Sequence, residues 1–205
     1  MDPARPDAEP EPSEPRARAA IAGHTGEEEV ARQLLHDPDP DVRATALAAL
    51  CRMGRATGDD VSTALGDAEP AVRRRAVALA LPFSTVPLLA LLNDPDPTVA
   101  EQAAWALGER DPAEAGCVAA LAAAARDHAD PLVREAAVAA LGSLGDPAGQ
   151  AAVVAATTDR PAVRRRAVLA LAAFDGPDVE DALQRALQDR DWQTRQSAET
   201  ILGAR

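Results

Sequence analysis

Five side chains of this sequence have the chemistry to ligate a transition metal or to act as nucleophiles. They are the histidines His24, His36 and His128 and the cysteines Cys51 and Cys117. The histidines lie far apart near expected helix ends, and the cysteines form no CxxC pair, so the spacing of a zinc site or a disulfide framework is absent. We interpret both cysteines as inert thiols within helices, rather than as nucleophiles or chromophore attachment points.

Catalytic motifs are also missing from the sequence. There is no glycine-rich phosphate loop, no Gly-x-Ser-x-Gly and no HExxH. The many carboxylates fall mostly at expected helix starts and turns, where they are ordinary partners of the helix dipole. The sequence therefore predicts no catalytic residues, no metal ligands and no cofactor, and the protein is not expected to be an enzyme.

Composition limits the partners and the location. The net charge is −12, which repels a phosphate backbone, so nucleic acid is not an expected partner. No apolar run is long enough to span a membrane, and the acidic, proline-rich start does not resemble a signal peptide. We expect a cytoplasmic protein. Residues 1–14 are rich in proline, alanine and acid, and are predicted to form a disordered tail.

The candidate residues must be positioned by helices, because the apolar content is mainly Ala, Leu and Val, and aromatic residues are only 2%. After about residue 15 one segment recurs six times: Pro-x-Val-Arg followed by a helix. Its valine column serves as a reference position and comprises Val42, Val72, Val99, Val133 and Val163, with Thr194 in the last copy. The spacings, near 30 residues, suit one helix–turn–helix unit per repeat.

Each column of the repeat has a physical reason. An Asp three residues before the reference position, as at Asp39, is a good N-cap, and the following proline suits the first helical position. Four residues after the reference position every copy has Ala, which allows helices to cross closely. These columns predict the second helix of each pair. First helices are predicted from Glu27, Ser84, Ala115, Pro147 and Asp178.

The expected fold class follows from this repeat. We predict an all-α, right-handed α-α superhelix over residues 15–205, with about six helix pairs. The segment Pro15–Gly23 is predicted to be the second helix of a truncated leading repeat. The closing copy is more polar, as the end of a finite solenoid should be.

The segments DPDPDVR, WALGE and VREAAVAALGSLGD resemble HEAT repeats, in particular the short subtype named from phycobilisome lyase subunits. The resemblance implies a ladder of Asp and Arg six residues apart, which matches Asp37 with Arg43, Asp67 with Arg73, and Asp189 with Arg195. The third copy has Ala100 in place of Arg, and the next two copies have His128 and Thr158 in place of Asp. The resemblance therefore implies a ladder that is broken in the middle.

The remaining candidate is a binding surface. Positions two and six residues after the reference position lie opposite the buried stripe, and in HEAT-like stacks the second helices usually line the concave face. The candidate partner-binding residues in this row are Arg74, Glu101, Trp105, Glu135, Arg165 and Leu169. Trp105 is either an exposed anchor for a partner or part of the core. Three interpretations are open for the arginine runs Arg73–Arg75 and Arg164–Arg166. They bind an acidic partner segment, they bind the acidic N-terminal tail, or they are ordinary helix faces in contact with solvent.

These observations favour a non-catalytic scaffold or adaptor that binds another protein through its concave face. We expect a monomer, with no membrane association. Two alternatives stay open. One is a lyase- or chaperone-like subunit that acts on a cofactor-bearing protein. The other is a HEAT-like DNA-binding protein, against which the net charge of −12 argues.

Overall fold

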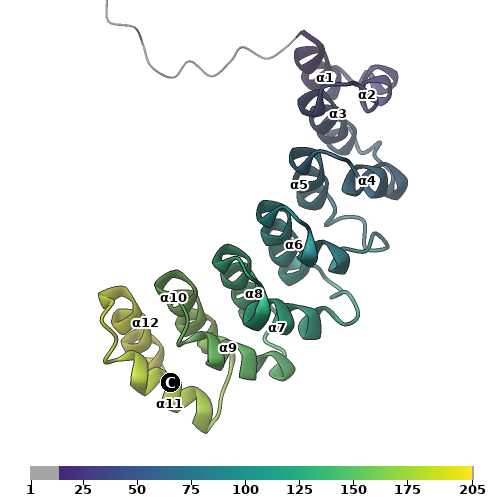
Figure 1. Ribbon diagram of the computed structural model, residues 1–205. Helices are drawn as coiled ribbons and strands as arrows, with labels where there is room; N and C mark the ends of the chain where they lie inside the picture. Colours follow the sequence, from purple (N-terminus) through teal and green to yellow (C-terminus); the bar gives the residue numbers. More distant parts are fainter. Residues whose placement is uncertain (1–13, 205) are drawn as a thin grey trace, which may run out of the picture.

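The computed structural model describes residues 14–204, which form a curved stack of helix pairs (Figure 1). One helix layer follows the inner side of the arc and the other follows the outer side. The inner helices are α1 (Glu14–Thr25), α3 (Pro40–Arg52), α5 (Pro70–Leu79), α6 (Pro97–Glu109), α8 (Pro131–Leu144), α10 (Pro161–Ala170) and α12 (Trp192–Gly203). The outer layer contains α2 (Glu28–Leu34), α4 (Gly58–Leu65), η1 (Leu89–Asn93), α7 (Cys117–Asp127), α9 (Gln150–Ala156) and α11 (Pro177–Ala186).

This arrangement confirms the predicted fold class: α1 is an unpaired inner helix, and six pairs follow it. The expected tail, residues 1–14, lies outside the described residues except for Glu14, at which α1 begins. Short 3₁₀ segments, η2 (Pro147–Gly149) and η3 (Leu171–Ala173), flank α9 and α10.

The inner helices begin where the sequence predicts, because their first turns are capped locally. The carboxylates of Asp39, Asp96, Asp130 and Asp191 each accept a hydrogen bond from the backbone N–H two residues later, at 2.8–3.1 Å. Such a bond satisfies one of the free donors of the first turn. α5 and α10 also begin at a proline, but Glu69 and Arg160 before them make no side-chain cap.

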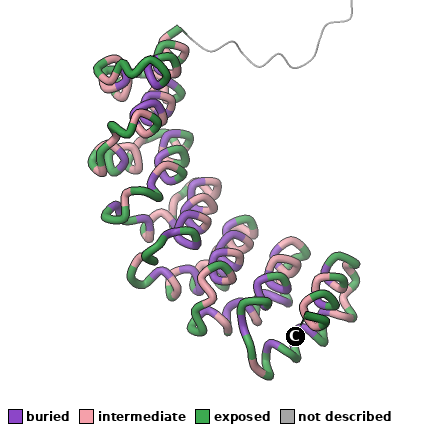
Figure 2. The backbone as a smooth tube through the Cα atoms, turned by 180° about the vertical axis from the view of Figure 1, so that it is seen from behind, coloured by how far each residue is buried: buried purple, intermediate pink, exposed green. Residues whose placement is uncertain are grey.

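The core lies between the two layers along the arc (Figure 2), as one large cluster from α3 to α12 and a smaller, separate cluster among α1, α2 and α3. All six residues at the reference position, and all six alanines four residues later, are at most 1% exposed. Small residues bring neighbouring inner helices together. A Cβ atom added to Gly108 of α6 would lie 2.7 Å from Ala140 of α8, and one on Gly142 would lie 2.7 Å from Ala170 of α10.

The outer layer departs from prediction in two places. The helix expected from Ser84 is wrong: only the five residues of η1 are helical there, and in 3₁₀ form. Pro87 lacks an N–H and disfavours a helical conformation at Val86, so a helix that starts at Ser84 cannot continue through the proline. Conversely, α4 was not among the predicted first helices. Its start carries a capping box, in which Thr57 and Asp60 each accept the other's backbone N–H.

Where the outer helix of the third pair is short, a buried ion pair holds the chain instead. Arg110, whose side chain is 1% exposed, donates from Nη1 to the Val86 carbonyl at 2.8 Å and to Glu114 Oε2 at 3.0 Å. Arg110 Nη2 donates to the Ala80 carbonyl at 3.3 Å. Glu114 in turn accepts the N–H of Leu88 at 3.0 Å. Two loops that lie far apart in sequence are thereby joined.

Candidate partner-binding face

The Asp–Arg ladder links successive repeats. Each ladder arginine donates to a backbone carbonyl of its own repeat, as Arg43 does to Asp37 O at 2.9 Å. Its guanidinium then pairs with a carboxylate of the next repeat. The side-chain pairs are Arg43–Asp67, Arg73–Asp94, Arg134–Asp159 and Arg164–Asp189, with closest N–O distances of 2.6–2.7 Å.

The predicted break in the ladder is confined to one junction. Asp159, the residue after Thr158, supplies the carboxylate that the aligned position lacks, so the link to Arg134 is intact. Among the six aligned copies within residues 14–204, the link is missing only between α6 and α8, where Ala100 and His128 replace both partners. His128 Nδ1 still accepts the N–H of Asp130 at 3.1 Å, which is the turn contact that Asp makes in other copies.

The ladder is an element of stability rather than a binding site. Hydrogen bonds from the paired arginine lower the pKa of Asp67, Asp94 and Asp159, and burial opposes this shift without reversing it. These carboxylates therefore remain ionised at neutral pH, with both oxygens engaged by a planar guanidinium.

The candidate residues all lie on inner helices, at the concave side of the arc (Figure 1). Arg74 on α5 is exposed and lines a groove of about 360 Å³ together with Asp41 and Thr45 of α3. Arg16 of α1, Arg75 of α5 and Gln102 of α6 complete the polar part of its lining. We call this the N-terminal groove.

The middle of the concave side is occupied by Glu101, Trp105 and Glu135. Trp105 is half-buried and packs against the core, and the guanidinium of Arg166 lies 5.5 Å from the centroid of its ring. Arg166 Nη2 is also 3.7 Å from Glu135 Oε1. Burial raises the pKa of Glu101, and the hydrogen bond with Trp105 opposes this shift. The Trp105 side chain therefore offers a partner less surface than an exposed anchor would.

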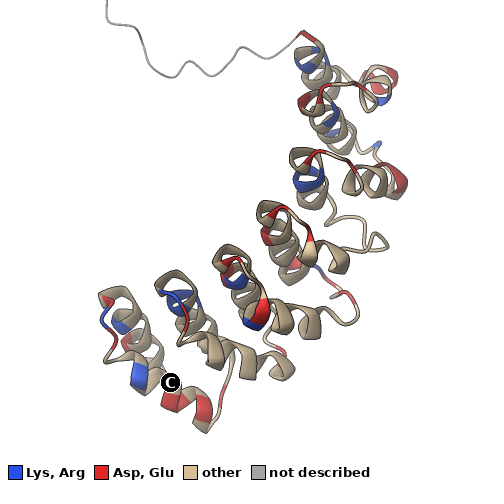
Figure 3. Ribbon diagram, in the orientation of Figure 1, with Lys and Arg blue, Asp and Glu red and all other residues tan. Residues whose placement is uncertain are grey.

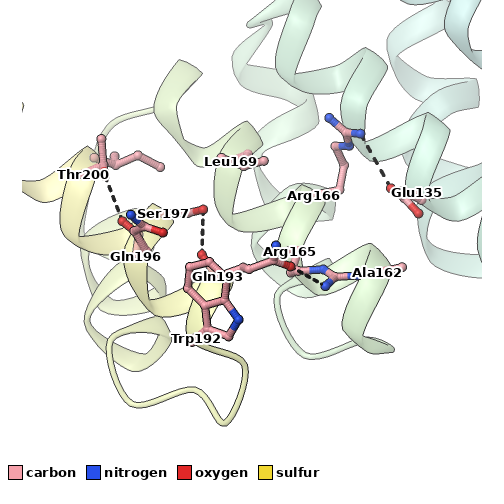
Figure 4. Close-up of a pocket in the computed structure, with 11 residues that line it drawn as sticks. Glu135, Ala162, Arg165, Arg166, Leu169, Trp192, Gln193, Gln196, Ser197 and Thr200 are labelled. Atoms are coloured by element: carbon pink, nitrogen blue, oxygen red, sulfur yellow. Dashed lines mark hydrogen bonds and ion pairs between the residues drawn. The ribbon is translucent and has the colours of Figure 1, made fainter.

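Arg165 and Leu169 lie in a second hollow, a cleft of about 480 Å³ between α10 and α12 (Figure 4). Leu169 is 49% exposed, and across the cleft Trp192 is 60% exposed. Arg165 Nη1 donates to Gln193 Oε1 at 2.7 Å. Glu135 of α8 lines the same cleft. We call this the C-terminal cleft.

Trp192 is the residue that the sequence analysis missed. It stands where the other copies have the helix-starting proline, in the closing copy that the sequence analysis describes only as more polar. A signal was nevertheless present. The first helical position faces solvent, so a large aromatic residue there is exposed unless another repeat covers it.

Neither Cys51 nor Cys117 lines either hollow of the concave side. Burial raises the pKa of both thiols. At neutral pH they are protonated and poor nucleophiles. Within residues 14–204, no group of His, Cys, Asp and Glu side chains is arranged to hold a metal ion. In the same part of the chain no helix is both long and apolar enough to cross a membrane.

Comparison with known proteins agrees with this geometry. A family model of HEAT repeats matches residues 12–81, 85–162 and 150–205, so the chain belongs to the HEAT repeat family. Among curated proteins, no sequence matches it. The Escherichia coli protein YibA has a similar structure, with a TM-score of 0.70 and 19% identity over 91% of this chain and 74% of that chain. A designed armadillo repeat protein aligns with a TM-score of 0.56 and 19% identity, over 85% of this chain and 98% of that one.

Proposed function

We propose that this protein is a non-catalytic scaffold or adaptor whose concave face binds a segment of another protein. The observation that carries the proposal is the C-terminal cleft. There two large apolar side chains, Leu169 and Trp192, remain about half exposed on either side of one hollow. Partner-binding sites combine an aromatic anchor with a pocket, and here an exposed Trp and an exposed Leu line the same cleft.

The polar groups of the cleft are suited to a polypeptide. Arg165 donates hydrogen bonds, and Gln193 and Gln196 line the same hollow and can both donate and accept. A backbone segment presents alternating donors and acceptors, while an apolar side chain of the segment would fill the space between Leu169 and Trp192. Glu135 at the edge of the cleft would favour a nearby positive charge on the segment.

A similar fold is known to support this mode of binding. A designed armadillo repeat protein solved in complex with the peptide (KR)4 has a TM-score of 0.50 to this chain, with 18% identity over 93% of this chain and 89% of that one. That protein shows that a solenoid of this kind can hold a peptide. It does not indicate which peptide this chain binds.

The test selects ligands from a displayed library of random peptides on the wild-type chain and then measures their dissociation constants. Replacing Leu169 and Trp192 with alanine should weaken the selected peptides at least about tenfold, because hot-spot side chains contribute about 2 kcal/mol or more. Ile21→Ala is the matched control, since Ile21 is 55% exposed on α1 at the other end of the stack. Equal affinity for the cleft variant and the wild type would exclude the cleft.

A further inference from the structure

One octapeptide occurs twice in this protein, and the fold places its two copies in different electrostatic surroundings. The sequence PAVRRRAV begins α5 at Pro70 and α10 at Pro161, and both copies appear as basic stretches of the inner layer (Figure 3). In each copy the first arginine belongs to the ladder, paired with Asp94 or with Asp189 of the next repeat.

The second and third arginines of the α10 copy are compensated within the chain. Arg165 donates to Gln193 and lies 3.5 Å from Asp191 Oδ2. Arg166 lies over the Trp105 ring and 3.7 Å from Glu135. These two guanidiniums therefore have neighbouring acceptors or a ring to stabilise them.

The corresponding pair in the α5 copy is not compensated in this way. The side chains of Arg74 and Arg75 are exposed, and neither forms a hydrogen bond or a close ion pair with another residue within 14–204; Arg74 only lies close enough to Glu101 to lower its pKa. They line the N-terminal groove beside Arg16, and the carboxylate in its lining, Asp41, is already 3.4 Å from Arg16. The groove thus holds an excess of positive charge in a chain whose net charge is −12.

Two kinds of anion could bind in the N-terminal groove: the carboxylates of a polypeptide and the phosphates of a nucleic acid. The structure favours the carboxylates. The positive charge of Arg74 and Arg75 covers only a small area, because carboxylates flank it. Asp41 lines the same groove, and Glu101 lies close enough for Arg74 to lower the pKa of the Glu101 carboxyl. A duplex carries a phosphate charge for about every 1.7 Å of its axis, and so would meet these carboxylates as well. A short acidic segment can place its charges at Arg74 and Arg75 alone.

We propose that the N-terminal groove binds an acidic segment of a partner protein, with Arg74 and Arg75 each contacting a carboxylate. Thr45 and Gln102, which line the same groove, supply hydrogen-bonding groups for the backbone of that segment. This proposal rests on the proposed function and assigns a charge preference to one end of the concave face. The C-terminal cleft, with Leu169 and Trp192 exposed in it, would take a different part of the partner.

The experiment measures fluorescence anisotropy of a fluorescein-labelled peptide of glutamate, serine and alanine with the full chain at low ionic strength. Arg74→Gln/Arg75→Gln should weaken binding about tenfold, because two exposed guanidinium–carboxylate contacts are removed. The matched control is Arg126→Gln/Arg185→Gln, which removes the same charge from exposed positions on α7 and α11 of the outer layer. It should change the affinity less than about twofold, because distant surface charges are screened.

Three results would overturn the proposal. Equal weakening by both double variants would mean that only the overall charge matters. Equal binding of a probe with glutamine in place of glutamate would mean that the groove does not recognise carboxylates. Tighter binding of a single-stranded DNA oligonucleotide than of the acidic peptide would assign the groove to nucleic acid.

A fourth measurement distinguishes two possible occupants of the N-terminal groove: a segment of a partner protein and the chain's own acidic N-terminal segment. Neutralising Asp2, Asp7, Glu9 and Glu11 to the corresponding amides should leave the affinity for the acidic probe unchanged. A gain of about tenfold would mean that this segment competes for the groove and is its occupant, because a tethered ligand has a high effective concentration. The acidic probe tests the N-terminal groove alone, so its failure is distinguishable from a failure of the library peptides at the C-terminal cleft.

Discussion

Removing Glu114 should destabilise the protein strongly, although no active site or predicted binding residue is involved. The Glu114 carboxylate is the charged partner of Arg110, whose side chain is 1% exposed, and it also accepts the N–H of Leu88. Glu114→Ala leaves a buried guanidinium held only by the carbonyls of Val86 and Ala80, and leaves the Leu88 N–H without that acceptor.

The magnitude follows from those two losses. Breaking a buried ion pair by removing one partner costs about 3–5 kcal/mol, and the 16% exposure of Glu114 places this pair at the lower end. We therefore expect Glu114→Ala to cost about 3 kcal/mol. For a domain of this size that corresponds to a fall in Tm of about 6–12 °C. Thermal unfolding followed by circular dichroism measures the change.

A double-mutant cycle tests the physical reason. Arg110→Met should also be destabilising, but Arg110→Met/Glu114→Ala should cost less than the sum of the two single changes, because no uncompensated charge stays buried. Hydrogen exchange should show that the loss of protection begins in residues 80–94, which the pair holds in place. If Glu114→Ala lowers stability by less than about 1 kcal/mol, or the costs simply add, the ion pair does not hold these loops.

Two further predictions concern the junctions between repeats. Because arginine lowers the folded-state pKa of Asp67, Asp94 and Asp159, the ladder contributes stability above the ordinary carboxylate pKa of about 4 and loses it as pH falls through the lowered values. The fall in Tm between neutral pH and about pH 3 should accordingly be smaller when these three residues are asparagine, and an unchanged slope would contradict the assignment. Gly108→Ala should cost about 1–3 kcal/mol, because its Cβ would lie 2.7 Å from Ala140. Gly203→Ala, with no atom within 4 Å of the added Cβ, is the control and should be neutral or slightly stabilising in the same denaturation measurement.

The repeat and the start of each inner helix could be predicted from sequence because their causes are local. An Asp N-cap, a proline at the first position and alanines at helical spacing act within one turn or one helix face, as at Asp39 and Ala46. Helical periodicity likewise places Arg74 and Leu169 opposite the buried stripe, and both are exposed, whereas Trp105 of the same row packs against the core; the binding role of the row stays a prediction.

Partners across a junction could not be predicted in the same way. In the alignment of the repeats, Thr158 occupies the position of the ladder Asp, so no partner for Arg134 is expected there. The carboxylate that accepts from Arg134 belongs to Asp159, because the turn brings the next residue to the position that the ladder Asp occupies in other repeats. Likewise, the Arg110–Glu114 pair joins loops whose approach depends on the absence of a regular outer helix after Pro87. No local pattern marks the approach of Asp159 to Arg134, or the contacts of Arg110 and Glu114 with Ala80, Val86 and Leu88, which lie at least 24 residues away in the sequence.

The two PAVRRRAV segments show most directly what sequence and tertiary structure each decide. The sequence alone determined that both begin an inner helix and that both carry three arginines. Only the tertiary structure decided that Arg165 and Arg166 are paired while Arg74 and Arg75 face a groove, and that Trp192 is left exposed beside Leu169. The physical reason is that helix formation depends on neighbours in the chain, whereas charge compensation and exposure depend on the side chains that the adjacent repeats bring into contact.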